Sequence, residues 1–150
     1  MTYRLLNCLV LCFILCICSP NDTNSSNITG DLSYLERNFN ELYENNYADF
    51  WKILHSSLME AKRCDSIEIT SRYLNLVNLP YKNAEFNEFF AESIEKLCLN
   101  SPGCFHEANR TLNKSVQKKL NTMLNNPLFI DKGSLYKSGC LNNTTLFLMQ

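Results

Sequence analysis

The sequence of 150 residues lacks several features that mark common functional classes. After residue 19, no stretch approaches the roughly twenty apolar residues that a transmembrane helix needs. There is no basic run with interleaved aromatic residues, which argues against a nucleic-acid partner. There is no CxxC pair with a nearby histidine, so no metal site is indicated. The only histidines, His55 and His106, have no evident nucleophile or metal ligand beside them. We therefore expect neither an enzyme nor a cofactor.

The first twenty residues, MTYRLLNCLVLCFILCICSP, have the layout of a secretory signal peptide. One arginine precedes about fifteen apolar residues, and small residues and a proline follow, a stretch too short to span a bilayer. We predict a leader over residues 1–19 and a secreted, extracellular protein with no membrane insertion. Four of the eight cysteines lie in this leader, so an even number remains for an oxidising compartment, where disulfides are the default interpretation.

The rest of the chain has the size of one domain. Residues 20–30 are polar, hold no core-forming side chains and contain three N-glycosylation sequons. They predict a glycosylated, flexible N-terminal segment ahead of a helical domain over residues 31–140, with a short C-terminal tail over residues 141–150. The sequons that we expect to carry glycans are at Asn21, Asn24, Asn27 and Asn142.

Apolar residues recur at helical spacing in three long segments. One helix is predicted over residues 46–62, a second from Asn83 as N-cap to Leu99, and a third from about Cys104 to Leu124. Residues 31–44 show the same period, but their stripe is rotated, which predicts a break near residues 45 and 46. On the second helix, four acidic residues are expected to face water: Glu85, Glu88, Glu92 and Glu95.

The connections between these helices are unequal in length. The joint at residues 100–103 is short, whereas residues 64–82 and 126–142 are long, and each holds a strand-like run, IEIT or PLFI. This pattern predicts an all-α fold: a short-chain up-up-down-down helical bundle whose long crossovers could pair as a small two-stranded β ribbon, held by two disulfides.

Four cysteines, Cys64, Cys98, Cys104 and Cys140, allow three pairings, and the sequence alone does not choose among them. A bridge from Cys98 to Cys104 would close a tight turn for little entropic gain. Bridges from Cys64 to Cys104 and from Cys98 to Cys140 would each close a loop of about forty residues and pin a crossover to the same end of the bundle. We favour this second arrangement.

Taken together, the chain resembles the interleukin-4 and interleukin-13 family of short-chain four-helix cytokines. The resemblance covers about residues 45 to 140. Its pieces are the helix YADFWKILHSSL followed by a cysteine, the IEIT crossover, a second helix ending in SPGC, a basic third helix, and a last crossover with a cysteine. It implies a monomeric ligand of a cell-surface class I cytokine receptor.

In the family, an acidic residue on the first helix and basic residues on the third engage a receptor chain. The resemblance places these roles on Asp49 and Lys52, and on Arg110, Lys114 and Lys118. Only the ten residues LNNTTLFLMQ follow Cys140, and this segment is a poor helix former. The last helix of the family is therefore expected to be missing or short. Either the chain is a truncated or spliced product, or the periodic segment over residues 31–44 takes the place of that helix. In the family, the first and last helices contact the second receptor chain, so the ligand is expected either to trigger or to antagonise immune signalling.

The alternative function is a secreted, disulfide-stapled helical carrier of a small apolar ligand. The aromatic stripe Phe86, Phe89 and Phe90 could line its pocket. Aromatic residues at helical spacing more often form an ordinary core, so the carrier ranks second.

Overall fold

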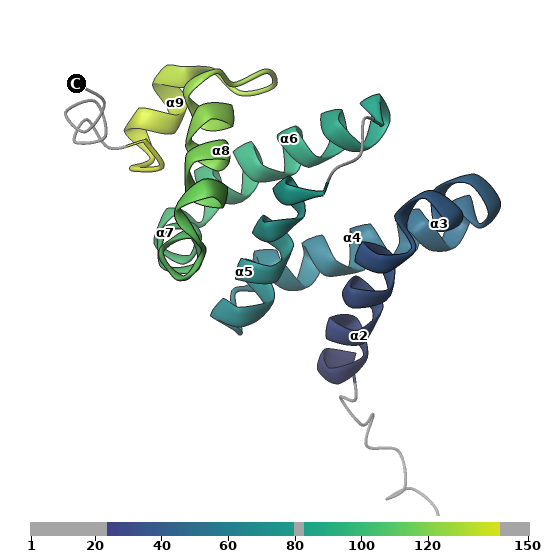
Figure 1. Ribbon diagram of the computed structural model, residues 1–150. Coiled ribbons are helices and arrows are strands. Elements are labelled where there is room, and N and C mark those ends of the chain that lie inside the picture. The colour runs from purple at the N-terminus through teal and green to yellow at the C-terminus, as the bar shows by residue number, and fades with distance from the viewer. Residues whose placement is uncertain (1–23, 80–82, 142–150) are drawn as a thin grey trace, which may run out of the picture.

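The computed structural model describes residues 24–79 and 83–141, with side chains from residue 31 onward. These residues form eight α-helices and one short 3-10 helix, and no strand occurs among them. The all-α class with two disulfides is therefore confirmed (Figure 1). The elements are α2 (Asn24–Arg37), α3 (Phe39–Asn45), α4 (Tyr47–Arg63), α5 (Ile67–Asn75), η1 (Leu76–Asn78), α6 (Ala84–Asn100), α7 (Pro102–Thr111), α8 (Lys114–Asn125) and α9 (Lys132–Lys137).

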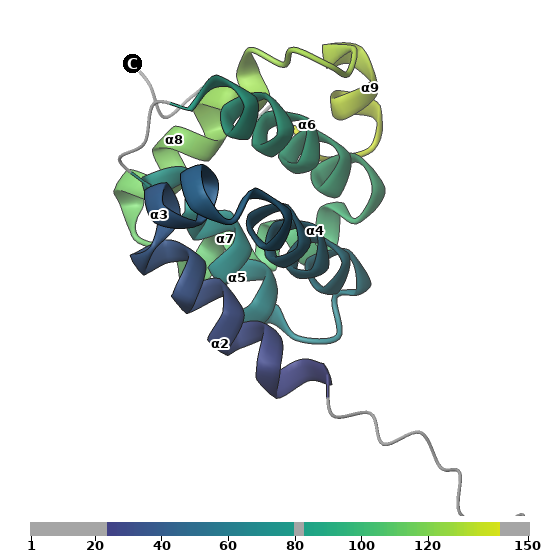
Figure 2. The same cartoon turned by 90° about the vertical axis from the view of Figure 1, so that its right-hand side faces the viewer.

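Helix α5 is central to the arrangement, because it packs against α4 on one side and α7 on the other (Figure 1). Helices α2 and α3 pack against α4. Helix α6 contacts α4, α8 and α9, and so links α4 to the last two helices of the described chain (Figure 2).

One core unites α2 to α9, and its largest fully buried side chains come from seven α-helices and from η1. Phe39 from α3 packs edge-on against Phe50 and Phe86, with ring centroids 4.9 and 5.0 Å apart. Such aromatic pairs add stability beyond the apolar area that they bury. The largest fully buried side chains of the core are those of Tyr73, Phe39, Phe50, Phe105, Leu35, Leu54, Leu74, Leu76, Ile94, Leu97, Leu120 and Leu124. Residues 31–44 therefore contribute to the core rather than standing apart from it.

Two long helices lie where the apolar period predicts them. Helix α4 runs over Tyr47–Arg63, and the break before it falls at Asn46, as expected. Helix α6 begins after Asn83, whose side-chain oxygen accepts the Phe86 N–H at 3.1 Å. That bond satisfies one of the free donors at the helix start, so the predicted N-cap is confirmed.

The predicted β ribbon is wrong, because the IEIT run begins helix α5. Ser66 caps this helix by accepting the Ile69 N–H at 3.4 Å. Four residues at helical spacing then bury one face: Thr70, Ser71, Tyr73 and Leu74. Burial of this face outweighs the modest strand preference of β-branched residues. The connection from α4 to the next helix is therefore short rather than a long crossover.

The third predicted helix is interrupted. Leu112 has extended backbone angles and ends α7, and Asn113 begins α8 by accepting the Val116 N–H at 3.0 Å. A polar N-cap residue within an apolar period can start a second helix. Here the break places the basic side chains before and after it on two different helices.

The last connection also contains a helix, α9, which Asp131 caps by accepting the Ser134 N–H. Residues 127–130 are not a strand. The up-up-down-down order stays a prediction. The expected leader over residues 1–19, the sequons at Asn21 and Asn142, and nearly all of the tail lie outside the described residues. The backbone of residues 24–30, assigned above to a flexible segment, belongs to α2.

Candidate functional site

The two disulfides form with the favoured pairing. Cys64 bonds to Cys104 with Cα atoms 6.1 Å apart, and Cys98 bonds to Cys140 with Cα atoms 5.3 Å apart. Both Cα separations lie in the usual range for disulfides. The first ties the end of α4 to α7, and the second ties the end of α6 to the segment after α9. Neighbouring cysteines around the α6–α7 joint therefore reach opposite parts of the fold.

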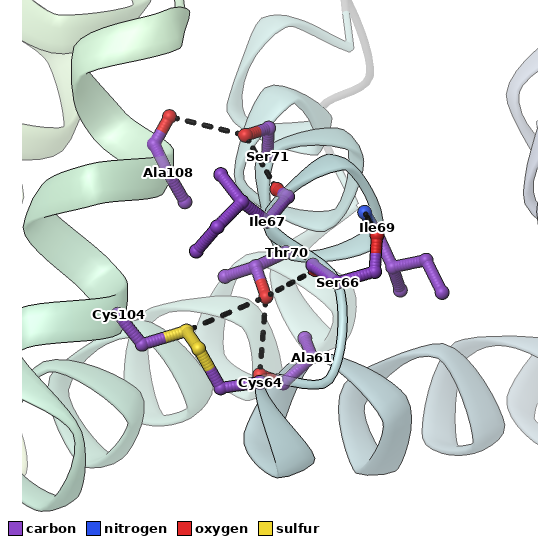
Figure 3. The surroundings of a disulfide bond; sticks show 9 residues. All are labelled: Ala61, Cys64, Ser66, Ile67, Ile69, Thr70, Ser71, Cys104 and Ala108. Atoms are coloured by element: carbon purple, nitrogen blue, oxygen red, sulfur yellow. Dashed lines mark hydrogen bonds between the residues drawn. A yellow bond between two sulfur atoms is a disulfide. The ribbon is translucent and has the colours of Figure 1, made fainter.

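The buried Thr70 hydroxyl contacts the first disulfide, and the neighbouring Ser71 hydroxyl bonds elsewhere (Figure 3). Thr70 Oγ1 lies 3.3 Å from the carbonyl oxygens of Ala61 and Ser66, and 3.7 Å from Cys104 Sγ. A disulfide sulfur carries no proton, so it can only accept from Thr70. Ser71 Oγ donates toward the Ala108 carbonyl at 3.1 Å and so links α5 to α7.

Asp49 and Lys52 lie on the outer side of α4, and both side chains are exposed. Asn46 Nδ2 donates to the Asp49 carboxylate at 2.8 Å. Asp49 is also in the first helical turn, where a negative charge is favoured by the helix dipole. Neither Asp49 nor Lys52 forms an ion pair with another residue in the described ranges.

The predicted basic residues are also exposed, but they do not share one helix. Arg110 lies in the last turn of α7, whereas Lys114 and Lys118 lie on α8, beyond the break at residues 112 and 113. None of the three makes an ion pair within the described part of the chain. Helix α5 lies between α4 and α7, so the structure presents the acidic and basic groups on separate helices of the fold.

Sequence reasoning missed the role of Glu95, which was expected to face water but is only 2 % exposed. Its carboxylate accepts three backbone N–H bonds, from Leu128 at 2.8 Å, Phe129 at 3.0 Å and Ile130 at 2.8 Å. Charged acceptors make the stronger protein hydrogen bonds. We call this arrangement the Glu95 clasp; it fixes the segment between α8 and α9 against α6.

The clasp holds two large apolar side chains in solvent, because Leu128 is 74 % exposed and Phe129 is 47 % exposed. The local sequence gives no signal of these hydrogen bonds, because residues 128–130 are more than thirty positions from Glu95 along the chain.

A groove of about 400 Å³ is lined by residues of α4 and α6 and by Phe129, which follows α8. Its aromatic lining is Tyr47, Trp51 and Phe89, with His55 beside them. The Trp51 and Phe89 rings meet edge to face, with centroids 5.2 Å apart. Its acidic lining is Glu85, Glu88 and Glu92. We call this feature the acidic aromatic groove.

At one end of the groove, two tyrosines share one carboxylate. The hydroxyl groups of Tyr43 and Tyr47 donate to Glu85 at 2.7 and 2.6 Å. These bonds favour the ionised carboxylate and lower the pKa of Glu85. The same bonds raise the pKa of both phenols, because loss of a phenol proton would remove the donor; the neighbouring Trp51 indole opposes this slightly for Tyr47.

The histidines have structural contacts. His106 Nε2 lies 2.9 Å from the Gly139 carbonyl oxygen, and the His55 ring packs edge-on against Phe89 at 4.7 Å. In the described ranges, no three acidic, histidine or cysteine side chains gather as metal ligands would. Across the same residues, no helix has both the length and the apolar character of a membrane span.

The aromatic stripe of α6 divides between two environments. Phe86 and Phe90 are buried, and Phe89 is half-buried in the acidic aromatic groove. Phe86 and Phe90 also border a cavity of about 290 Å³, together with Leu79 and Met123.

No family model, curated protein or solved structure matches this chain. The candidate surfaces are therefore judged by their own chemistry. Three features could recognise a partner: the exposed charges on α4, those on α7 and α8, and the acidic aromatic groove.

Proposed function

We propose that this protein is a secreted cytokine-like ligand that binds a class I cytokine receptor through the outer faces of α4 and of α7 with α8. Binding would trigger or antagonise immune signalling. The interface residues are Asp49, Lys52, Arg110, Lys114 and Lys118.

The observation that carries this proposal is the pairing of the four cysteines. Both bridges tie the end of a long helix to a distant segment, so α4, α6 and α7 are held in a fixed arrangement. A rigid framework lowers the entropic cost of binding, because the interface does not have to be ordered when the partner arrives. This framework suits an extracellular ligand, because disulfides persist in the oxidising environment outside the cell.

The exposed charges give such a ligand specificity. Asp49, Lys52 and Arg110 make no ion pair within the described ranges, so a receptor does not have to break one to engage them. Complementary charges across an interface speed encounter and exclude wrong partners. The charged residues on α4 and those on α7 and α8 lie on either side of α5, which fits a receptor that contacts two helices at once.

The experiment is surface plasmon resonance with purified class I cytokine receptor ectodomains, chosen after flow cytometry shows which leukocytes bind the labelled protein. Asp49→Ala is expected to weaken binding at least about fivefold, which corresponds to about 1 kcal/mol. Glu44→Ala is the matched control, because Glu44 is also exposed but lies on α3. Equal affinity of Asp49→Ala and the unmodified protein would show that the assigned α4 site is wrong.

A second candidate, the carrier of a small apolar ligand, is favoured by the cavity beside Phe86 and Phe90. Its volume of about 290 Å³ lies just below the usual range for small-molecule sites, which begins at about 300 Å³. Displacement of a fluorescent fatty acid by lipids would favour this function. The absence of fatty-acid uptake, together with receptor binding, would favour the cytokine-like ligand.

A further inference from the structure

The acidic aromatic groove has negative charge that the protein itself leaves partly unbalanced. Glu92 pairs with Lys96 at 2.5 Å. Glu85 receives two neutral phenol donors, which hold its carboxylate in place without cancelling its charge. The Glu88 side chain forms none of the ion pairs found in the described part of the chain and lies exposed on α6. The groove therefore favours a positively charged occupant.

The aromatic lining favours the same charge. A cation above a tryptophan, tyrosine or phenylalanine ring is attracted by the negative face of the ring, and the attraction grows as the site loses water. Tyr47 is 49 % exposed and Phe129 is 47 % exposed, so these rings are available to an incoming group. Trp51 and Phe89 are more buried and form the apolar part of the lining. Arginine side chains suit such a surface because a planar guanidinium can stack on a ring and bond to a carboxylate together.

The spacing of the carboxylates indicates an extended occupant rather than a single small ion. Glu85, Glu88 and Glu92 follow one another along α6 at intervals of about one helical turn, roughly 5 to 6 Å. Side chains two residues apart on an extended peptide lie roughly 6.5 to 7 Å apart on the same side. Two alternate basic residues of a peptide could therefore each meet a carboxylate, whereas one ammonium ion would leave at least one unmatched.

The Glu95 clasp prepares the edge of the groove. Three N–H bonds to its buried carboxylate hold the backbone of residues 128–130, so Phe129 lines the groove, while the exposed Leu128 borders the neighbouring cavity. Large exposed apolar side chains on a fixed backbone are typical of interaction sites.

We propose that the acidic aromatic groove is a docking site for an extended basic segment of a partner protein, with arginine or lysine side chains seated on its rings and between Glu85 and Glu88. Apolar residues that flank the basic ones would contact Phe129. This site goes beyond the proposed receptor contact and does not depend on it, because it uses neither Asp49 nor the basic residues of α7 and α8.

Trp51 is the only tryptophan in the sequence and lines the groove, so its fluorescence reports occupancy directly. The probe is a synthetic ten-residue peptide of alternating arginine and serine, titrated into the full protein with its disulfides intact. We expect saturable change in Trp51 emission and weaker binding at higher salt, because exposed charges are screened. A peptide with glutamine in place of arginine should give no change.

The variants separate groove binding from general attraction to an acidic protein. Glu88→Gln is expected to weaken peptide binding about three- to tenfold, and Phe129→Ala to weaken it by a similar factor. Glu107→Gln is the matched control; it removes an exposed carboxylate from α7, away from the groove lining, and should leave the affinity unchanged. Circular dichroism would verify that each variant is folded.

Three results would overturn the proposal. One is an unchanged Trp51 spectrum at a saturating peptide concentration. Another is an equal loss of affinity in Glu88→Gln and Glu107→Gln. The third is tetramethylammonium competing as tightly as the peptide, which would show that the groove takes a small free cation. None of these depends on receptor binding, so the two proposals fail separately.

Discussion

Replacement of Glu95 tests whether its buried carboxylate holds the segment between α8 and α9. Glu95→Ala removes the acceptor for three backbone N–H groups, those of residues 128, 129 and 130. Glu95→Gln is subtler, because a carbonyl oxygen can still take the place of the oxygen that accepts from Phe129 and Ile130. Its amide nitrogen then faces the Leu128 N–H, so one bond is replaced by two opposed donors.

The expected magnitude follows from these bonds. A hydrogen bond to a charged group contributes about 1.5 to 3 kcal/mol, and the three share one carboxylate, so their sum overstates the effect. The carboxylate was also dehydrated on folding, and the freed N–H groups of this partly exposed segment can reach water. We expect the free energy of unfolding to fall by about 3 kcal/mol in Glu95→Ala and by about 2 kcal/mol in Glu95→Gln.

The assay is urea unfolding followed by far-ultraviolet circular dichroism, with the disulfides intact. Glu92→Gln is the matched control, since Glu92 lies one turn away and forms only a partly exposed pair with Lys96. It should change stability by less than about 0.5 kcal/mol. Hydrogen exchange adds a local measurement, because the amides of residues 128–130 should be protected in the unmodified protein and lose protection first in Glu95→Gln.

A result that Glu95→Ala is as stable as Glu92→Gln would refute this reasoning. So would exchange of the three amides at the rate of an unfolded peptide in the unmodified protein.

Two further predictions concern the second disulfide and the tyrosine pair. The double variant of Cys98→Ser and Cys140→Ser should lose about 4 kcal/mol of stability, since it opens a loop with a sequence separation of 42 residues; a loss under about 1 kcal/mol in urea unfolding would contradict it. Tyr43 and Tyr47 should ionise above the usual tyrosine range when phenolate absorbance is followed against pH, and Glu85→Gln should bring both back toward it. Because the pKa of Glu85 is lowered and those of the phenols are raised, the bridge should persist at neutral pH and weaken both as acid protonates Glu85 and as base ionises the phenols. Unchanged phenol titration in Glu85→Gln would refute that assignment.

The two long helices α4 and α6 could be predicted from the sequence because their signals are local, and the disulfide pairing could be narrowed but not fixed. The buried stripe of α4 repeats every three or four residues, and the Asn83 cap precedes α6 directly. Loop size argued only against a bridge from Cys98 to Cys104. The fold then decides between the two remaining pairings, because it brings Cys64 to Cys104 and Cys98 to Cys140.

The errors arose where tertiary contacts decide between local options. The IEIT run satisfies both a strand pattern and the start of a helix, and burial of Thr70 and Tyr73 selects the helix. The break before α8 had a local signal, since Asn113 stands three residues before Val116 as an N-cap does, but the continuous apolar period concealed it.

The groove and the clasp were not accessible to sequence reasoning. Glu95 falls on the polar side of the α6 pattern, and only the return of residues 128–130 to α6 buries it. The groove in turn combines side chains from α4, α6 and the segment after α8, which no sequence period links.

Two disulfides, interleaved along the chain, lock the helices into the framework that presents these surfaces, and we propose that the chain acquires them on secretion. The most direct test of this central claim is peptide mapping by mass spectrometry, without reduction, of the protein recovered from the medium of eukaryotic cells that express the full sequence. The account predicts two linked peptide pairs, Cys64 with Cys104 and Cys98 with Cys140. A bridge between Cys98 and Cys104, free thiols at these positions, or retention of the protein inside the cells would contradict it.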